Sequence, residues 1–165
     1  MKAARYVPAL ATVASVLAGH LALADEPVAP ARFAAGGVVF QANCAVCHRA
    51  NGAGQPGLAP PLTGYPALYL QHPEGRRQLV FTVLYGMFGD VVVDERHYNF
   101  KMPDFARLDD TVLADVLNFV AFDLGRADAQ AAPLAPADIA AERSLGLAGE
   151  SVRRHRLEVL NAVRR

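Results

Sequence analysis

Residues 44–48 read CAVCH, and they contain the only two cysteines among the 165 residues of the chain. Two residues separate the thiols, and a histidine follows the second cysteine directly. Three kinds of site use cysteines at this spacing: a disulfide, a metal site and a covalent cofactor attachment site. The rest of the sequence discriminates between them.

A disulfide or a zinc site explains the motif poorly. A bridge across two intervening residues closes a very short loop and stabilises a fold little. Redox-active C-x-x-C pairs accompany a βαβ pattern, which this sequence lacks. Structural zinc is usually held by four protein ligands, but no third cysteine is present, and His72, His97 and His155 are scattered along the chain.

Covalent haem attachment accounts for every residue of the motif. One helical turn presents the thiols of Cys44 and Cys47 to the same edge of the macrocycle, where they add to the two vinyl groups. His48 then directs a ring nitrogen at the iron as the proximal ligand. The motif therefore predicts one covalently bound haem c with its iron.

The sixth ligand of the iron must come from farther along the chain. Met102 precedes a proline, which favours an extended backbone and leaves the methionine sulfur on a loop. Met87 falls at the end of a predicted helix, where methionine commonly fills gaps in a core. The sequence favours Met102, with Met87 and His97 as alternatives. An open or labile sixth position would instead indicate a haem protein that binds or senses small ligands.

With these residues the chain resembles the class I mono-haem cytochromes c, most closely the bacterial periplasmic ones that act as carriers or as electron-transfer subunits of dehydrogenases. The resemblance covers roughly residues 32–126. It implies an all-α cytochrome c fold, with about three core helices around one covalently bound haem. It also implies one-electron transfer without a catalytic activity of its own, in exchange with a periplasmic dehydrogenase, oxidase or reductase. Alternatively, the chain is a dedicated subunit of a dehydrogenase complex.

The first helix carries further positions of this resemblance. Gly36, Phe40 and Cys44 recur at four-residue intervals and therefore lie along one helix face. A glycine there allows a second helix to cross closely. By resemblance, the crossing helix is the last one of the domain, where Val116 and Phe119 match the family positions that meet Gly36 and Phe40.

The loop after the haem motif, NGAGQPGLAPPLTG, is too rich in glycine and proline for regular structure. By resemblance, the carbonyl of Pro60 accepts a hydrogen bond from Nδ1 of His48, Leu62 lies against the haem face and Gly64 completes the turn. A helix is predicted over 74–87 and a loop or short hairpin over 90–100. Candidates for contacts with the haem propionates flank the start of that helix: Tyr65, Tyr69, Arg76 and Arg77.

Residues 1–24 have the layout of a secretory signal peptide, with a basic start, an apolar run and Ala22-Leu23-Ala24 before an acidic stretch. The apolar run is also nearly long enough for an uncleaved membrane anchor, but Pro8 and His20 weaken that interpretation. We expect export to a bacterial periplasm and a cytochrome c domain over 25–126.

Residues 127–165 form a tail with an alanine- and proline-rich linker and two predicted helices, at about 136–144 and 149–164. The second has an apolar stripe of Val152, Val159, Leu160 and Val163 and an arginine-rich opposite face. We favour a helix folded back on its own domain over a docking element for an acidic partner or an anionic membrane surface.

Charge excludes one class of partner and constrains another. The whole chain has 16 basic and 16 acidic residues, and removal of 1–24 would leave it slightly acidic. A short basic stretch beside an acidic domain does not suit nucleic acid. After cleavage Lys101 is the only lysine, so docking through a ring of lysines is excluded and apolar or arginine-mediated contact with redox partners is expected.

Overall fold

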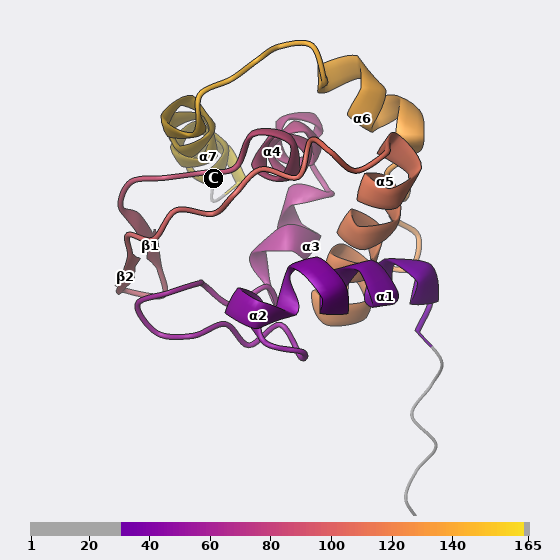
Figure 1. The fold of residues 1–165 in the computed structure, drawn as a ribbon, viewed down its shortest axis with the longest axis horizontal. Helices are drawn as coiled ribbons and strands as arrows, with labels where there is room; N and C mark the ends of the chain where they lie inside the picture. Colours follow the sequence, from indigo (N-terminus) through magenta and orange to yellow (C-terminus); the bar gives the residue numbers. More distant parts are fainter. Residues whose placement is uncertain (1–30, 164–165) are drawn as a thin grey trace, which may run out of the picture.

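The computed structural model of the protein describes residues 31–163 (Figure 1), and the predicted signal peptide lies outside them. The elements, in chain order, are α1 (Ala34–Asn43), α2 (Ala45–His48), α3 (Tyr65–Tyr69), α4 (Pro73–Tyr85), β1 (Val91–Val93), β2 (Arg96–Tyr98), α5 (Asp110–Asn118), the π-helical turn η1 (Phe119–Leu124), α6 (Pro136–Glu142) and α7 (Gly149–Val163). Across this part of the chain, none of the helices combines the length and apolar character needed to cross a bilayer.

Helices α1 and α5 cross (Figure 1), and the two backbones come closest at Gly36. A Cβ atom built on Gly36 would lie 2.0 Å from the carbonyl oxygen of Asp115 and 2.9 Å from Cβ of Phe119. The rings of Phe40 and Phe119 meet beside this point, with 5.5 Å between their centroids. The predicted packing of Gly36 and Phe40 against the last helix of the domain is confirmed.

The last helix of the domain is not regular along its whole length. After Asn118 it widens into η1, and Gly125 donates its N–H to the carbonyl of Val120 at 2.9 Å. The following Ala127 N–H reaches the carbonyl of Ala121, also at 2.9 Å. This π-helical ending turns the chain toward the tail, and the sequence pattern contained no signal for it.

Helix α4 ends two residues earlier than the sequence suggested, and this corrects the placement of Met87. Gly86 stops the helix in the left-handed region at φ 68°, and a Cβ there would lie 2.5 Å from the carbonyl oxygen of Met102. Glycine is the residue that adopts this conformation without strain. Met87 therefore lies outside the helix, so its placement within a core helix was wrong, although its side chain does pack against the small apolar cluster of β1 and β2.

The predicted hairpin is present as β1 and β2, which pair antiparallel with Val91 opposite Tyr98. The side chains of Val91, Val93 and Tyr98 are buried and form a small apolar cluster. The hairpin leads the chain from the end of α4 to the segment that carries Met102.

The tail is folded back on its own domain, in agreement with the favoured prediction. Helix α6 packs on α4 and α5, and α7 packs on α4 (Figure 1). The apolar stripe of α7 is buried at Val152, Val159 and Leu160, and Ile139 of α6 is fully buried. Both helices therefore belong to the folded core.

Polar contacts fix the tail at several points. The amide of Asn118 pairs with the backbone of Leu134, donating from Nδ2 at 2.9 Å and accepting at Oδ1 at 2.8 Å. Arg143, directly after α6, donates to the carbonyl oxygens of Ala106 and Leu108 and to the carboxylate of Asp110. These bonds satisfy backbone groups of the loops that they join.

Candidate haem site

A single apolar cavity gathers the residues that the sequence singled out. Its walls come from α1 and α2, the loop after α2, α3, α4, the hairpin, the Met102 segment, α5 and α7. All six predicted site residues line it: Cys44, Cys47, His48, Pro60, Leu62 and Met102.

Cys44 lies between α1 and α2, and Cys47 lies in α2, within the same helical turn. The N–H groups of Cys47 and His48 both bond the carbonyl of Cys44, at 3.2 and 3.0 Å, and the cysteines form no disulfide. Burial, with a smaller contribution from nearby Cys47, raises the pKa of the Cys44 thiol to about 11. Such a thiol stays protonated and lacks the lowered pKa of a redox-active dithiol.

His48 is buried, and its ring is oriented by the loop that follows. Nδ1 lies 2.9 Å from the carbonyl oxygen of Pro60, so the ring donates from this nitrogen. Burial lowers the pKa of His48, and the bond to Pro60 opposes that effect only in part. A neutral imidazole with Nδ1–H engaged keeps the lone pair of Nε2 for a metal ion.

The glycine-rich loop is held tightly enough to place Pro60. Gly54 donates its N–H to the carbonyl of His48 at 2.9 Å, and the N–H of Leu62 bonds the carbonyl of Gly52 at 2.8 Å. A Cβ on Gly54, which has φ 71°, would lie 2.5 Å from the carbonyl oxygen of Ala59. The loop therefore closes back on α2 and directs Pro60 at the histidine ring.

Two methionines reach the cavity on the side of the Met102 segment. Met87 and Met102 exchange both backbone hydrogen bonds, at 3.1 and 2.9 Å, and both side chains line the cavity. The N–H of Phe105 bonds the carbonyl of Val83 at 2.7 Å and ties the segment to α4. Met102 is thus on a loop, as predicted. Met87 lies beside it at the same cavity, so the position of the backbone alone does not separate the two methionines as candidate ligands.

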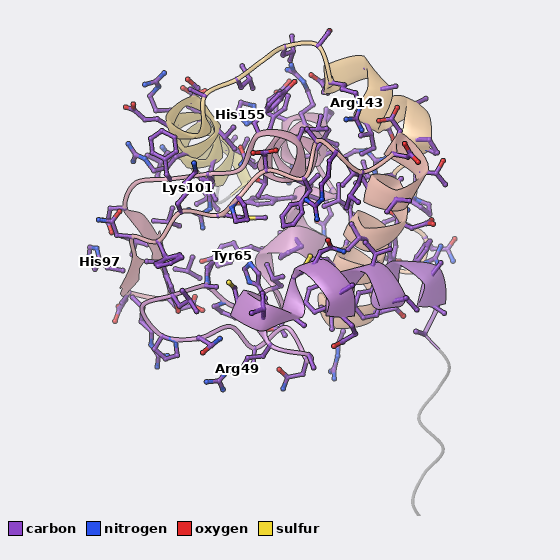
Figure 2. The ribbon with its side chains drawn as sticks, viewed as in Figure 1. Arg49, Tyr65, His97, Lys101, Arg143 and His155 are labelled. Atoms are coloured by element: carbon purple, nitrogen blue, oxygen red, sulfur yellow. The ribbon has the colours of Figure 1, made fainter. Side chains whose placement is uncertain are left out.

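His97 is directed away from this cavity. It lies on the outer side of the hairpin (Figure 2), its side chain is 71% exposed, and its Nδ1 is 2.9 Å from the carboxylate of Asp90. Of the described residues, no group of three or more His, Cys, Asp and Glu side chains forms a cluster that could hold a metal ion. Unlike Met87 and Met102, His97 is not among the described residues that line the cavity.

The predicted propionate contacts divide into two groups. Tyr65 and Tyr69 line the cavity. Arg76 instead donates to the carbonyl oxygens of Ala132 and Pro133 in the tail, and Arg77 to the carboxylate of Glu142.

Arg156 of α7 also lines the cavity, and sequence reasoning did not select it. Its position was still present in the pattern, because Val152, Arg156 and Leu160 recur every four residues and share one helix face. A face that buries Val152 and Leu160 also turns Arg156 inward.

Two thiols on one turn, a neutral histidine after them and an apolar cavity define a c-type haem protein. The sequence model of the cytochrome c family matches residues 33–121, and the chain belongs to this family. It is similar to a cytochrome c-552 of Thermus thermophilus, with 41% identity over 115 residues, which cover 70% of this chain and 72% of the relative. A second cytochrome c-552 of Thermus thermophilus is 43% identical over 93 residues, covering 56% of this chain and 71% of that protein.

The chain is thus a class I c-type cytochrome that binds haem c covalently and functions in electron transfer with redox protein partners. The residues of the cavity fit that group. Cys44, Cys47 and His48 line the cavity together with apolar side chains that would shield a large apolar ring from water: Phe40, Leu79, Val83, Val116 and Leu117.

Proposed function

We propose that the chain is a periplasmic carrier of single electrons in which His48 and Met102 are the axial ligands of the haem iron. The observation that carries this proposal is the convergence of Cys44, Cys47, His48 and Met102 on one apolar cavity. The haem supplies an iron that alternates between the ferric and ferrous states. The protein supplies attachment, two axial ligands and exclusion of water.

Met102 suits the sixth position because backbone hydrogen bonds hold its loop beside the end of α4. Backbone bonds to Met87 on one side and from Phe105 to Val83 on the other fix the loop on α4. A thioether ligand is neutral and favours the reduced iron relative to a second histidine. With both axial positions taken by the protein, the site is suited to electron exchange rather than to substrate binding.

The partners we propose are a periplasmic dehydrogenase, oxidase or reductase that meets an apolar surface beside the cysteines. Val46 and Phe100 both line the cavity and are 78% and 61% exposed. Apolar contact of this kind suits a domain whose only lysine is Lys101. We also propose that residues 1–24 act as a signal peptide for export, before a domain at 25–126 and the tail at 127–165.

A free carrier is favoured over a dedicated subunit because the tail is engaged with its own domain. Arg143, which would be open to a partner if the tail were extended, is bound to α5 and to the loop before it (Figure 2). Ile139 and Val152 of the tail are also fully buried, so they are not accessible to a partner either.

The ligand assignment is tested by adding carbon monoxide to the haem-loaded chain and to one variant of each of the two methionines. We expect the Soret band of the reduced parent to stay unchanged in carbon monoxide, because both axial positions are filled. Met102→Ala should bind carbon monoxide and lose the charge-transfer band between methionine sulfur and ferric iron. Met87→Leu should keep the parent spectrum.

Two outcomes would overturn parts of this proposal. A prompt shift of the parent's Soret band at low carbon monoxide would indicate an open or labile sixth position and a ligand-binding or sensor protein. If Met102→Ala kept the parent spectrum and Met87→Leu lost the methionine band, Met87 would be the ligand.

A further inference from the structure

Arg156 is a buried charge on the wall of the haem cavity. It lies on α7, outside the segment that matches the cytochrome c family, and only 6% of its surface is exposed. Its guanidinium carbon lies 5.9 Å from the centre of the Tyr65 ring, and both residues line the cavity. A cation–π contact of this kind holds the guanidinium in place but does not neutralise it.

Among residues 31–163, no carboxylate forms an ion pair with Arg156. The described residues that line the haem cavity include no aspartate or glutamate, although Lys101 adds a second cation. Asp90, Asp94 and Glu95 border a neighbouring cavity that Arg156 also lines. Within the described part of the chain, however, none of these carboxylates is in ion-pair contact with Arg156. Burying a charge is costly unless an opposite charge accompanies it.

Helix α7 holds this side chain in a fixed position. The adjacent residue, His155, donates from Nδ1 to the amide oxygen of Gln78 on α4 at 2.7 Å and packs edge-on against Phe81 (Figure 2). Val152 and Leu160, one turn on either side, are buried. The packing of α7 on α4 thus determines where the guanidinium lies.

The haem of a c-type cytochrome brings the missing anion. Thioether bonds to Cys44 and Cys47 would hold the vinyl groups of the haem at these residues, and its two propionate carboxylates would extend from the opposite edge of the macrocycle. Arg156 belongs to the wall formed by α7, Tyr65 and the hairpin, and not to the wall that bears the cysteines. A planar guanidinium is well suited to bind a carboxylate through two parallel hydrogen bonds.

We propose that Arg156 binds a haem propionate, so that the C-terminal tail completes the cofactor site. The inference rests on the haem placement proposed above. A cation beside the propionate keeps that carboxylate ionised and disfavours the ferric state, which carries the additional positive charge. The tail thereby raises the reduction potential and makes it insensitive to pH near neutrality.

The experiment compares haem-loaded full-length variants by the midpoint potential measured between about pH 5 and pH 8. Arg156→Gln should lower the potential, and the potential should rise again toward acid pH as the unpaired propionate binds a proton. Arg156→Lys should restore much of the loss. Arg154→Gln is the matched control, because Arg154 lies on the same helix but is 58% exposed and pairs with Glu150.

The proposal is wrong if Arg156→Gln has the same potential and pH profile as Arg154→Gln. If Arg156→Gln does not fold, redox difference infrared spectroscopy of Arg156→Lys decides. Relative to the parent protein, the carboxylate bands of the propionates shift in Arg156→Lys if Arg156 binds a propionate. They stay in place if Arg156 only packs on Tyr65. The methionine-to-iron band reports ligation separately, so an error in the Met102 assignment is distinguishable from an error about Arg156.

Discussion

Gly36 sets the distance between the helix that leads into the haem motif and the helix that crosses it. The carbonyl oxygen of Asp115 occupies the space that a side chain would need. Because Cys44 follows at the end of α1, a shift of that helix would also displace the attachment site. The absence of a Cβ atom at Gly36 therefore contributes to the position of the haem attachment site.

We expect Gly36→Ala to lower the free energy of unfolding by about 2–3 kcal/mol, because the new Cβ overpacks the α1–α5 crossing. Gly37→Ala is the control: its Cβ would lie 3.1 Å from the edge of the Phe119 ring, a side chain, and not 2.0 Å from a backbone carbonyl oxygen as at Gly36. Alanine also gains helix propensity at both positions. Denaturant unfolding of the haem-loaded variants, followed by circular dichroism, measures the difference. Equal stabilities for the two variants would contradict the role given to Gly36.

Sequence reasoning at this scale succeeded where the information was local and failed where it was not. Cys44, Cys47 and His48 lie within one helical turn, so their spacing alone determines that they face together. The placement of Met87 within the helix was wrong because Gly86 ends α4 through a left-handed conformation that the apolar pattern around it does not reveal. The pattern of α7 turns Arg156 inward, but only the fold brings that face of the helix to Tyr65 and the cavity, which are distant in sequence.

Between elements, α7 is joined to α4 by an ionisable contact at the protein surface. The carboxylate of Glu74 accepts hydrogen bonds from Nε2 of His155 at 3.2 Å and from Arg77 at 3.1 Å. The hydrogen bond from His155, followed by the charge of Arg77, lowers the pKa of Glu74 below its usual value of 4.5. The contact is exposed, so solvent screens it and its contribution is small.

A lowered carboxylate pKa stabilises the folded state above the unfolded pKa, and this contribution is lost as the pH falls through the folded pKa. We expect Glu74→Gln to cost up to about 1 kcal/mol of unfolding free energy at neutral pH. The difference from the parent should fade as the pH is lowered below 4.5. Denaturant unfolding at a series of pH values measures it. A difference that stayed constant with pH would show that the variant acts through packing.

The sequence predicted the helices of the tail well and the ending of the domain helix poorly. Apolar spacing located α6 and α7 to within a few residues, because amphipathic periodicity is a property of the helix itself. The π-helical turn η1 has no such signature. Its hydrogen bonds from Gly125 and Ala127 depend on where the chain goes next.

At the scale of the whole molecule, the tail and the cytochrome domain share one apolar core. Phe40 of α1, Leu113 of α5, Ile139 of α6 and Leu160 of α7 belong to the same cluster of buried side chains. Elements that share a core unfold together in small proteins. The tail is therefore part of the cooperative unit.

Ile139→Ala should lower the free energy of unfolding by about 2–4 kcal/mol, because it leaves a cavity at a fully buried position. The haem absorbance and the helical circular dichroism should shift to lower denaturant together. Leu145→Ala, at a side chain that is 48% exposed, is the control and should change little. A separate early transition of the helical signal, with the haem band unchanged, would mean that the tail unfolds alone.

The pairing of Asn118 with Leu134 has a consequence for the kinetics of the native state. Leu134 belongs to a stretch without regular secondary structure, yet its N–H is buried and donates to the Asn118 amide oxygen at 2.8 Å. In deuterated water this N–H should exchange as slowly as those of the core helices, and far more slowly than the exposed residues beside it. Its exchange rate would report how often the tail detaches from the domain.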